Sequence, residues 1–309
     1  MTVVDVHQCP RCELRFASRP ELADHVRTDH LPTPGDDIPA PVPAGSGTLL
    51  VAQDPTADPT RVVPFAATLA RQVGMRLEIA AVPPIGLGGP VDLRGAAEAA
   101  RRAGGPEVRA RVLTSASRVG RAILDRAALP DVALLCIATH GGGPRAALAG
   151  SVGALVIRSS PVPVVVLGPQ HARTAIDAVH RVVACVDGSD RAALAVPVAA
   201  ALAQRLGART VILHVAPCGS SARGRGLGLD GLRRLADTLE GLATFDLLRD
   251  DDPAQAIVRY AGDGGDTLVA LATHDRGGVL AAVLGSVTAT VVDAARCPVL
   301  VVPRRATLR

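Results

Sequence analysis

The sequence predicts an α/β protein in which two similar domains, each with a five-stranded parallel sheet, follow a small amino-terminal ββα module. Three observations lead to this prediction. They are an internal repeat, apolar strands that alternate with helical stretches, and a Cys/His pattern in the first thirty residues. The length of 309 residues suits two domains of ordinary size and one additional module.

The composition indicates aliphatic cores. The chain is 48% hydrophobic, yet its only aromatic residues are Phe16, Phe65, Phe245 and Tyr260, so we expect cores of Val, Ala and Leu. The net charge of +4 is modest and does not by itself indicate nucleic acid. Apolar runs such as residues 161–168 are shorter than the roughly 18 residues of a membrane span, and the amino terminus lacks the features of a secretory signal. We therefore expect a cytoplasmic protein without a membrane segment.

Residues 1–31 hold a metal-ligand pattern. Cys9 and Cys12 are followed, after twelve residues, by His25 and His30. Two cysteines and two histidines at this spacing supply the ligands that tetrahedral Zn²⁺ requires. The pattern resembles a C2H2 zinc finger, which implies a ββα fold around one Zn²⁺ ion.

The charges of this module favour a protein partner over DNA. The positions that read bases in such fingers fall on Ser18, Glu21 and Asp24, of which two are acidic. Four arginines and five acidic residues through residue 30 give a net charge of −1, which offers little attraction to phosphates. Residues 32–46 contain five prolines and are typical of an extended linker.

The rest of the chain is a duplication. Residues 47–169 (copy one) and 180–304 (copy two) repeat one pattern. Asp54 recurs as Asp187 and Gly150 as Gly285, at offsets of 133 and 135 residues. A nearly constant offset over this length indicates two domains of the same fold.

The strands of both copies are continuous apolar runs, as is typical of parallel sheets that helices cover on both faces. In copy one we expect strands at residues 47–53, 76–82, 107–113, 131–138 and 162–167. In copy two we expect them at residues 181–186, 209–215, 243–248, 266–272 and 298–302. Helical stretches at 64–74 and 196–207 each close with a glycine. Sheets of this kind bind ligands at the carboxyl ends of their strands.

Four features together resemble the universal stress protein family. They are a first strand that ends in an Asp-containing turn, a fourth strand that runs into a glycine-rich loop, a GSV helix start, and a short last strand, PVPVVVL or CPVLVV. The resemblance covers residues 47–304 and implies an adenine-nucleotide-hydrolase-like, Rossmann-like domain in each copy. Some members bind ATP through a G-x2-G-x9-G-S/T loop, and the last strand commonly pairs in dimers. The resemblance thus implies pairing of the last strands, between the two halves of this chain or in a homodimer.

The same resemblance implies an adenine-nucleotide site in each copy. In copy one the implied contacts are Ala52, Asp54, Val82, His140, Gly141, Gly142, Gly150 and Ser151. In copy two they are Cys185, Asp187, Val215, His274, Gly277, Gly285, Ser286 and Thr288. Glycines let the backbone approach phosphate oxygens, and the helix that follows offers N–H groups, with Ser expected to cap it.

Both loops depart from the family pattern. Ala138 and Ala272 replace the first glycine, whereas the second is kept as Gly141 in copy one and replaced by Asp275 in copy two. A carboxylate about 4 Å from a phosphate oxygen costs roughly 4 kcal/mol at an effective dielectric near 20, or about three decades of affinity. Arg276, or a Mg²⁺ ion bound by Asp275, would relieve that repulsion. The loop pattern therefore favours ATP binding in copy one.

Two hypotheses of function follow. In the first, the protein is a nucleotide-responsive stress or signalling protein whose zinc finger contacts another protein. In the second, both loops only turn the chain, and a nucleotide-free scaffold presents the finger to a protein or, less favoured, to DNA. Catalysis by His140 or His274 beside a serine lacks an orienting group, so we expect no enzyme beyond weak ATP hydrolysis.

Overall fold

The chain divides into two units, Met1–Ala40 and Pro41–Arg309. The computed structural model describes residues 7–8, 15–16, 47–83, 91–113, 118–139, 152–171, 178–219, 231–233, 236, 239, 243–263, 265–273 and 285–303. In the first unit, β1 (His7–Gln8) and β2 (Arg15–Phe16) form a two-stranded antiparallel sheet. His7 pairs with Phe16 in this hairpin, and Gln8 pairs with Arg15.

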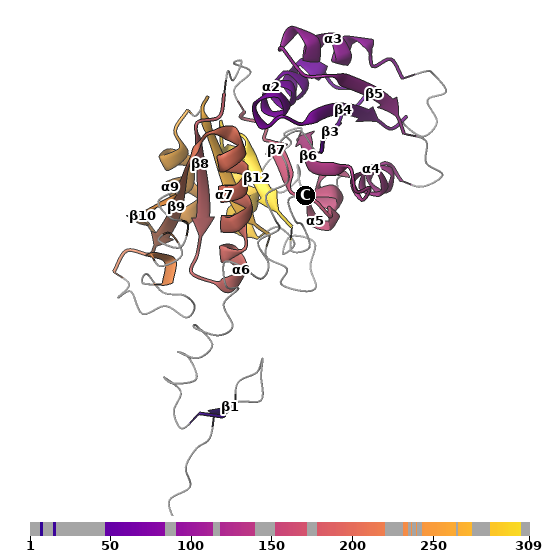
Figure 1. Cartoon of the computed structure of the whole chain (residues 1–309). Coiled ribbons are helices and arrows are strands. Elements are labelled where there is room, and N and C mark those ends of the chain that lie inside the picture. The colour runs from indigo at the N-terminus through magenta and orange to yellow at the C-terminus, as the bar shows by residue number, and fades with distance from the viewer. Residues whose placement is uncertain are drawn as a thin grey trace, which may run out of the picture. The chain divides into compact units, whose positions relative to one another are not determined.

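The second unit is built on one sheet of ten strands, in the order β10-β9-β8-β11-β12-β7-β6-β3-β4-β5 (Figure 1). Copy one supplies β3 (Thr48–Ala52), β4 (Arg76–Ala81), β5 (Val108–Val112), β6 (Val132–Ala138) and β7 (Val164–Leu167). Copy two supplies β8 (Arg181–Val186), β9 (Arg209–Ala216), β10 (Ala243–Arg249), β11 (Thr267–Ala272) and β12 (Val299–Val302). Within each copy all pairs are parallel, and the strand order is the same.

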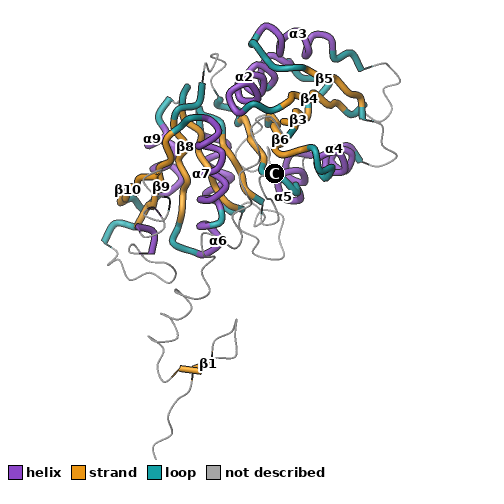
Figure 2. The backbone as a smooth tube through the Cα atoms, in the orientation of Figure 1, coloured by secondary structure: helices purple, strands orange, loops and turns teal. Residues whose placement is uncertain are grey.

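Helices cover both faces of this sheet (Figure 2). Copy one contributes η1 (Pro59–Arg61), α2 (Val63–Val73), α3 (Arg94–Arg102), α4 (Val119–Ala127) and α5 (Val152–Ser159). Copy two contributes α6 (Asp190–Ala193), α7 (Ala195–Leu206), α9 (Pro253–Ala261) and α10 (Ser286–Ala294). Helices α4, α5, α9 and α10 pack on one continuous apolar cluster that crosses both copies. As expected, α2 and α7 end at glycines in left-handed conformation, Gly74 and Gly207.

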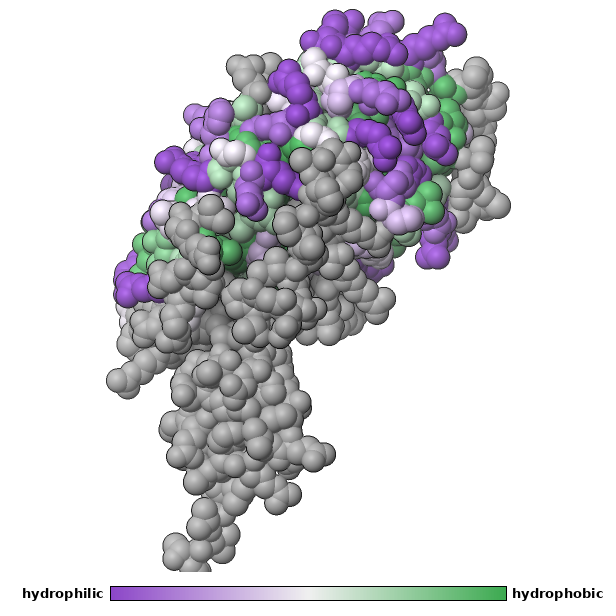
Figure 3. Space-filling model, in the orientation of Figure 1, coloured by the Kyte–Doolittle hydropathy of each residue, from purple (hydrophilic) through white to green (hydrophobic). Residues whose placement is uncertain are grey.

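The core is aliphatic, as the composition predicts. The largest fully buried side chains are all Leu or Ile, from both copies. Helix α3 is amphipathic: its alanines are buried, and Arg94, Arg101 and Arg102 are exposed on the outer surface. Figure 3 shows this hydrophilic surface at the top of the view.

The two copies are joined by their last strands. β7 pairs antiparallel with β12, with Val164 opposite Val301, Val165 opposite Leu300 and Val166 opposite Val299. The expected pairing between the halves is thereby confirmed. The other expectation, a homodimer through these strands, is wrong for this structure, because β7 and β12 each have both edges paired within the chain.

Strand β6 contains a bulge that β11 lacks. Thr48 pairs with Val132, whereas the next residue, Leu49, pairs with Leu134, so Ala133 is extra. β11 pairs with β8 without such a shift. The bulge absorbs the one additional residue of copy one in this strand, and the residues that follow both strands therefore reach equivalent places at the carboxyl edge.

Gln72 fixes the first helix of copy one to copy two. Its Nε2 donates to the carbonyls of Val179 at 2.7 Å and Leu206 at 2.8 Å, and its Oε1 accepts from the Val179 N–H at 2.9 Å. A side chain that satisfies three backbone groups holds the copies in one arrangement.

Candidate functional site

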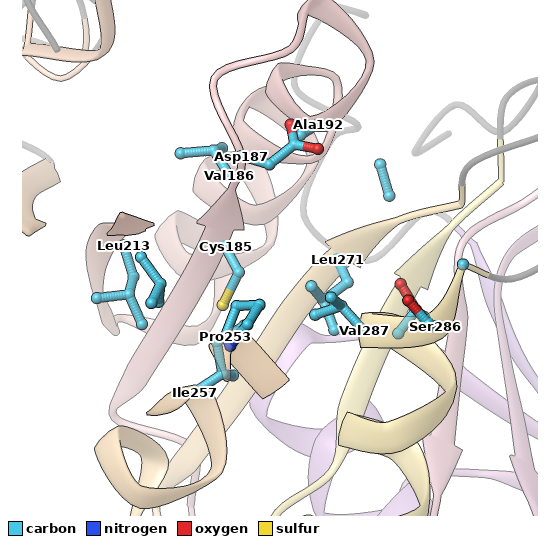
Figure 4. A pocket seen from close by; sticks show the side chains of 14 residues that line it. Cys185, Val186, Asp187, Ala192, Leu213, Pro253, Ile257, Leu271, Ser286 and Val287 are labelled. Carbon is cyan, nitrogen blue, oxygen red and sulfur yellow. The ribbon is translucent and has the colours of Figure 1, made fainter. Parts of the chain in front are cut away.

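A cavity of about 470 Å³ lies at the carboxyl ends of β8, β9 and β11, where α10 begins (Figure 4). This is the place at which open parallel sheets bind ligands, and the volume suits a small organic molecule. The lining residues come from three strands and three helices of copy two or from their ends: Cys185, Val186, Asp187, Ala192, Leu213, Val215, Pro253, Ile257, Leu271, Ala272, Gly285, Ser286, Val287 and Thr288.

The structure brings together six of the eight residues that the family resemblance implies for copy two. These are Cys185, Asp187, Val215, Gly285, Ser286 and Thr288, all of which line the cavity. The other two, His274 and Gly277, lie outside the described residues. Residues that are up to about a hundred positions apart in the sequence therefore form one site.

Asp187 is held in a tight turn at the end of β8. Its Oδ1 accepts hydrogen bonds from the Ser189 N–H at 2.9 Å and the Ser189 hydroxyl at 2.6 Å. Copy one has the same turn, because Asp54 Oδ1 accepts from the Thr56 N–H at 2.8 Å and hydroxyl at 2.7 Å. The Asp at the end of the first strand therefore folds the chain back in both copies, and it places a carboxylate at the rim.

Helix α10 points its amino terminus at the cavity. Gly285 is the residue before the helix, with φ 77°, and Ser286 is the first helical residue. The expectation that this serine caps the helix is wrong, because the cap position is Gly285 and no described side chain bonds the first turn. The N–H groups of that turn carry the positive end of the helix dipole and attract anions. Thr288, which is 3% exposed, lines the cavity beside this turn.

The floor of the cavity is apolar. Cys185, Leu213, Ile257 and Leu271 are buried, with between 0% and 6% of each residue exposed. Burial raises the pKa of the Cys185 thiol well above its usual range, so the thiol is neutral and unreactive. Figure 4 shows its sulfur on the side of Pro253 and Ile257. The cavity thus combines an apolar base, one carboxylate and one helix amino terminus.

In copy one the structure describes three of the eight implied residues. Ala52 and Val82 lie at the carboxyl ends of β3 and β4, Ala52 half-buried and Val82 7% exposed, and Asp54 is exposed at the rim. The remaining residues, His140, Gly141, Gly142, Gly150 and Ser151, lie outside the described residues.

Sequence reasoning missed the apolar floor. Leu213 could have been predicted from the sequence, because it lies two residues before Val215 in the same strand and therefore on the same face of the sheet. Pro253, Ile257 and Leu271 join the site through the packing of α9 against β9 and β11. Such a wall depends on how a helix lies on the sheet, and no local pattern reports it.

The four residues predicted to bind zinc, Cys9, Cys12, His25 and His30, lie outside the described residues. Cys9 and Cys12 fall in the segment that joins β1 to β2. Within the part of the chain that the structure describes, no cluster of three or more His, Cys, Asp or Glu side chains is suited to a metal ion. No helix among those residues is long and apolar enough to span a membrane.

A family comparison identifies the class of protein. The model of the universal stress protein family matches residues 46–168 and, a second time, residues 178–303. The two matches cover most of the chain, so this protein belongs to the universal stress protein family. No curated protein matched the sequence.

Two solved structures support the same fold. A universal stress protein from Archaeoglobus fulgidus DSM 4304 is 19% identical, with a TM-score of 0.62, over 83% of this chain and 96% of that one. A protein of Pseudomonas aeruginosa UCBPP-PA14, assigned to the same family, is 19% identical, with a TM-score of 0.57, over 85% and 95%. A universal stress protein solved in complex with cAMP is 27% identical, with a TM-score of 0.35, over 40% and 96%. The first two likenesses extend across both copies.

Proposed function

We propose that this protein binds an adenine nucleotide in the copy-two cavity and acts as a stress-response or signalling protein, and not as an efficient enzyme. The observation that carries the proposal is the convergence of six family-implied residues on a single cavity. The loop glycines favour copy one, but they report only on phosphate contact, whereas the described cavity supplies room for the rest of a nucleotide in copy two.

The chemistry of the lining matches the parts of a nucleotide. Cys185, Leu213 and Leu271 offer an apolar surface to a purine base. Asp187 offers carboxylate oxygens to ribose hydroxyls, which are hydrogen-bond donors. The first turn of α10, at Ser286 and Thr288, offers N–H and hydroxyl groups to a phosphate. When a nucleotide is bound, Mg²⁺ would neutralise phosphate charge.

The lining also supports binding over catalysis. Among the described lining residues the titratable side chains are Cys185 and Asp187. The Cys185 thiol has a raised pKa through burial, and Asp187 is engaged by Ser189. The Ser189 hydroxyl that donates to Asp187 also accepts from the Ala192 N–H, so this pair serves the turn and the start of α6. We therefore propose at most slow ATP hydrolysis.

The test uses purified full-length protein freed of nucleotide, titrated with ATP and AMP in the presence of Mg²⁺ by calorimetry. Cys185→Leu fills the floor of the cavity and should weaken binding about tenfold or more, as expected for overpacking a site. Cys185→Ala adds no volume and serves as the control. Ala52→Leu is the equivalent change in copy one and should leave the affinity unchanged.

Three results would count against this proposal. No binding of either nucleotide at millimolar concentration removes the nucleotide function. Loss of binding in Ala52→Leu together with normal binding in Cys185→Leu moves the site to copy one. Rapid ATP turnover would contradict the non-enzymatic part. Thermal melting of each variant verifies that the fold is retained.

We also propose that Cys9, Cys12, His25 and His30 hold one Zn²⁺ ion. The β1–β2 hairpin supports this, because the ββα module of a zinc finger begins with two antiparallel strands around its cysteine pair. The acidic base-reading positions favour a protein partner. The second candidate function, a scaffold that presents this module, rests on the same hairpin.

Metal analysis tests the zinc module. Purified protein should carry one zinc per chain, and Cys9→Ser with Cys12→Ser should remove it. Cys218→Ser, at an exposed cysteine outside the pattern, should retain it. A zinc-free native protein overturns the proposal. Partner capture that is lost with the zinc, but is indifferent to ATP, would favour the scaffold function.

A further inference from the structure

We propose that the connector after β7 positions α10 and thereby sets the shape of the copy-two cavity. The connector is residues 168–171, which follow β7 directly. Gly168 and His171 are the two positioning residues. A segment that copy one supplies would therefore control a cavity that lies wholly in copy two.

Gly168 touches the backbone of α10. A Cβ added at this buried glycine would lie 1.9 Å from the carbonyl oxygen of Val292 and 3.1 Å from its carbonyl carbon. Contacts this short with backbone do not occur, so any larger residue must displace one of the two segments. Glycine is thus required here for close approach, and α10 rests directly on the connector.

His171 makes a second contact with the same end of α10. Its Nδ1 lies 3.0 Å from the carbonyl oxygen of Arg296, which follows the helix. On the copy-one side, its ring meets Phe65 edge-on, with the ring centroids 6.0 Å apart. The imidazole is 7% exposed, so its position is fixed by packing from both copies.

The connector is itself anchored to copy one. The Gly168 carbonyl accepts a hydrogen bond from Nη2 of Arg61 at 2.7 Å and another from the His171 N–H at 3.1 Å. Arg61 ends η1, which follows the Asp54 turn of copy one. The connector therefore cannot move freely when α10 presses on it.

Helix α10 links these contacts to the cavity. Val292 lies six residues after Ser286, which is about 9 Å along a helix. Val291 and Val292 are buried, and close packing makes so short a helix move as one body. A displacement at Val292 therefore shifts the wall formed by Gly285, Ser286 and Thr288.

The test measures opening of the cavity through a thiol in its floor. Gly168→Ala is made in the full chain, and alkylation of Cys185 under native conditions is followed by mass spectrometry of peptides. Cys136, buried in β6 of copy one, reports unfolding elsewhere. We expect Cys185 to react about tenfold faster, with Cys136 unchanged, because only a local opening is introduced. Gly265→Ala, which meets no atom within 4 Å, is the matched control and should have no effect.

A second pair of variants decides the matter if Gly168→Ala fails to fold. His171→Leu removes the donor to Arg296 and should also expose Cys185, whereas His171→Asn keeps a donor near the Nδ1 position and should restore protection. Unchanged Cys185 labelling in the variants, or a parallel rise at Cys136, overturns the proposal. The readout needs no nucleotide, so its failure is distinct from failure of the proposed function. If nucleotide binds, Gly168→Ala should weaken it and Gly265→Ala should not.

Discussion

Arg126 of α4 and Glu78 of β4 form a buried, bidentate ion pair, with Nε–Oε1 and Nη2–Oε2 distances of 2.8 and 2.7 Å. Asp131 accepts two further bonds from the same guanidinium, at 2.9 and 2.7 Å. In the equivalent place copy two has Tyr260, whose hydroxyl donates to Asp246. The two copies thus fix a helix to the sheet by different chemistry, to β4 in copy one and to the edge strand β10 in copy two.

Removing the arginine should destabilise copy one strongly. Arg126→Met removes the bidentate partner of buried Glu78 and leaves it only the 3.4 Å pair with the exposed Arg111, so we expect a loss of about 3 kcal/mol in the free energy of unfolding. Urea denaturation measures this loss. Arg121→Met breaks an exposed pair with Asp125 and should cost less than about 1 kcal/mol. An equal effect of both changes would contradict the role of burial.

The interface between the copies should weaken in acid through His171. Burial lowers the pKa of its imidazole below the ordinary value of 6.5; the bond to the Arg296 carbonyl opposes this shift, and the nearby charge of Arg61 adds to it. The folded state thus favours the neutral ring, so the unfolded chain binds the proton first as the pH falls. Stability is therefore complete above 6.5 and decreases as the pH falls from 6.5 towards the lower folded pKa.

Urea unfolding at about pH 7.5 and about pH 5.5 checks this direction. His171→Asn keeps a hydrogen-bond donor but does not titrate, so its stability should depend less on pH than that of the unchanged protein. An identical pH dependence in both proteins would remove His171 from the explanation.

The Asp187 turn should depend on the hydroxyl of Ser189. This hydroxyl donates to Asp187 and also accepts from the Ala192 N–H at 3.2 Å, so it caps α6. Ser189→Ala should cost about 1 kcal/mol of stability and weaken nucleotide binding. Ser189→Thr should behave as the unchanged protein, because Thr56 makes the same turn in copy one. Calorimetry and thermal melting measure both effects.

Charge in the copy-two loop should limit nucleotide affinity. Asp275→Gly removes the carboxylate and should strengthen ATP binding at least about tenfold. An uncompensated carboxylate would lower the affinity by roughly three decades. Asp275→Asn removes the charge without the backbone freedom that glycine adds, and it should give a similar gain in ATP affinity. Weaker binding with loss of Mg²⁺ dependence would instead make Asp275 a metal ligand. No change in either variant would mean that the loop does not contact phosphate.

Most of the fold could be predicted because its strands are uninterrupted apolar runs. The strand expected at 181–186 has those bounds, and the strand expected at 76–82 ends one residue earlier. The joining of both sheets through β7 and β12 followed from the family resemblance, and not from the strands themselves. The bulge at Ala133 was not predicted, because one additional apolar residue leaves the pattern of a buried strand unchanged.

The site was predicted only where its residues leave a local signal in the sequence. Asp187 and Ser286 stand where a strand ends and a helix begins, and such boundaries leave local signals. The apolar floor at Ile257 comes from a helix that packs across the sheet, which depends on tertiary contacts. The loop glycines pointed to copy one, whose loop lies outside the described residues, and the described cavity lies in copy two.

The pairing of β7 with β12 has a consequence for how the sequence of this protein can evolve. In a symmetric dimer every substitution at the interface occurs twice, once on each side of the two-fold axis. In this chain the two sides are encoded separately, so Gly168 follows β7 whereas Pro303 follows β12, and Gln72 of α2 corresponds to Arg205 of α7. A single substitution therefore alters one half alone. The halves are free to diverge as a complementary pair, in which one encloses a cavity and the other holds its helix in place.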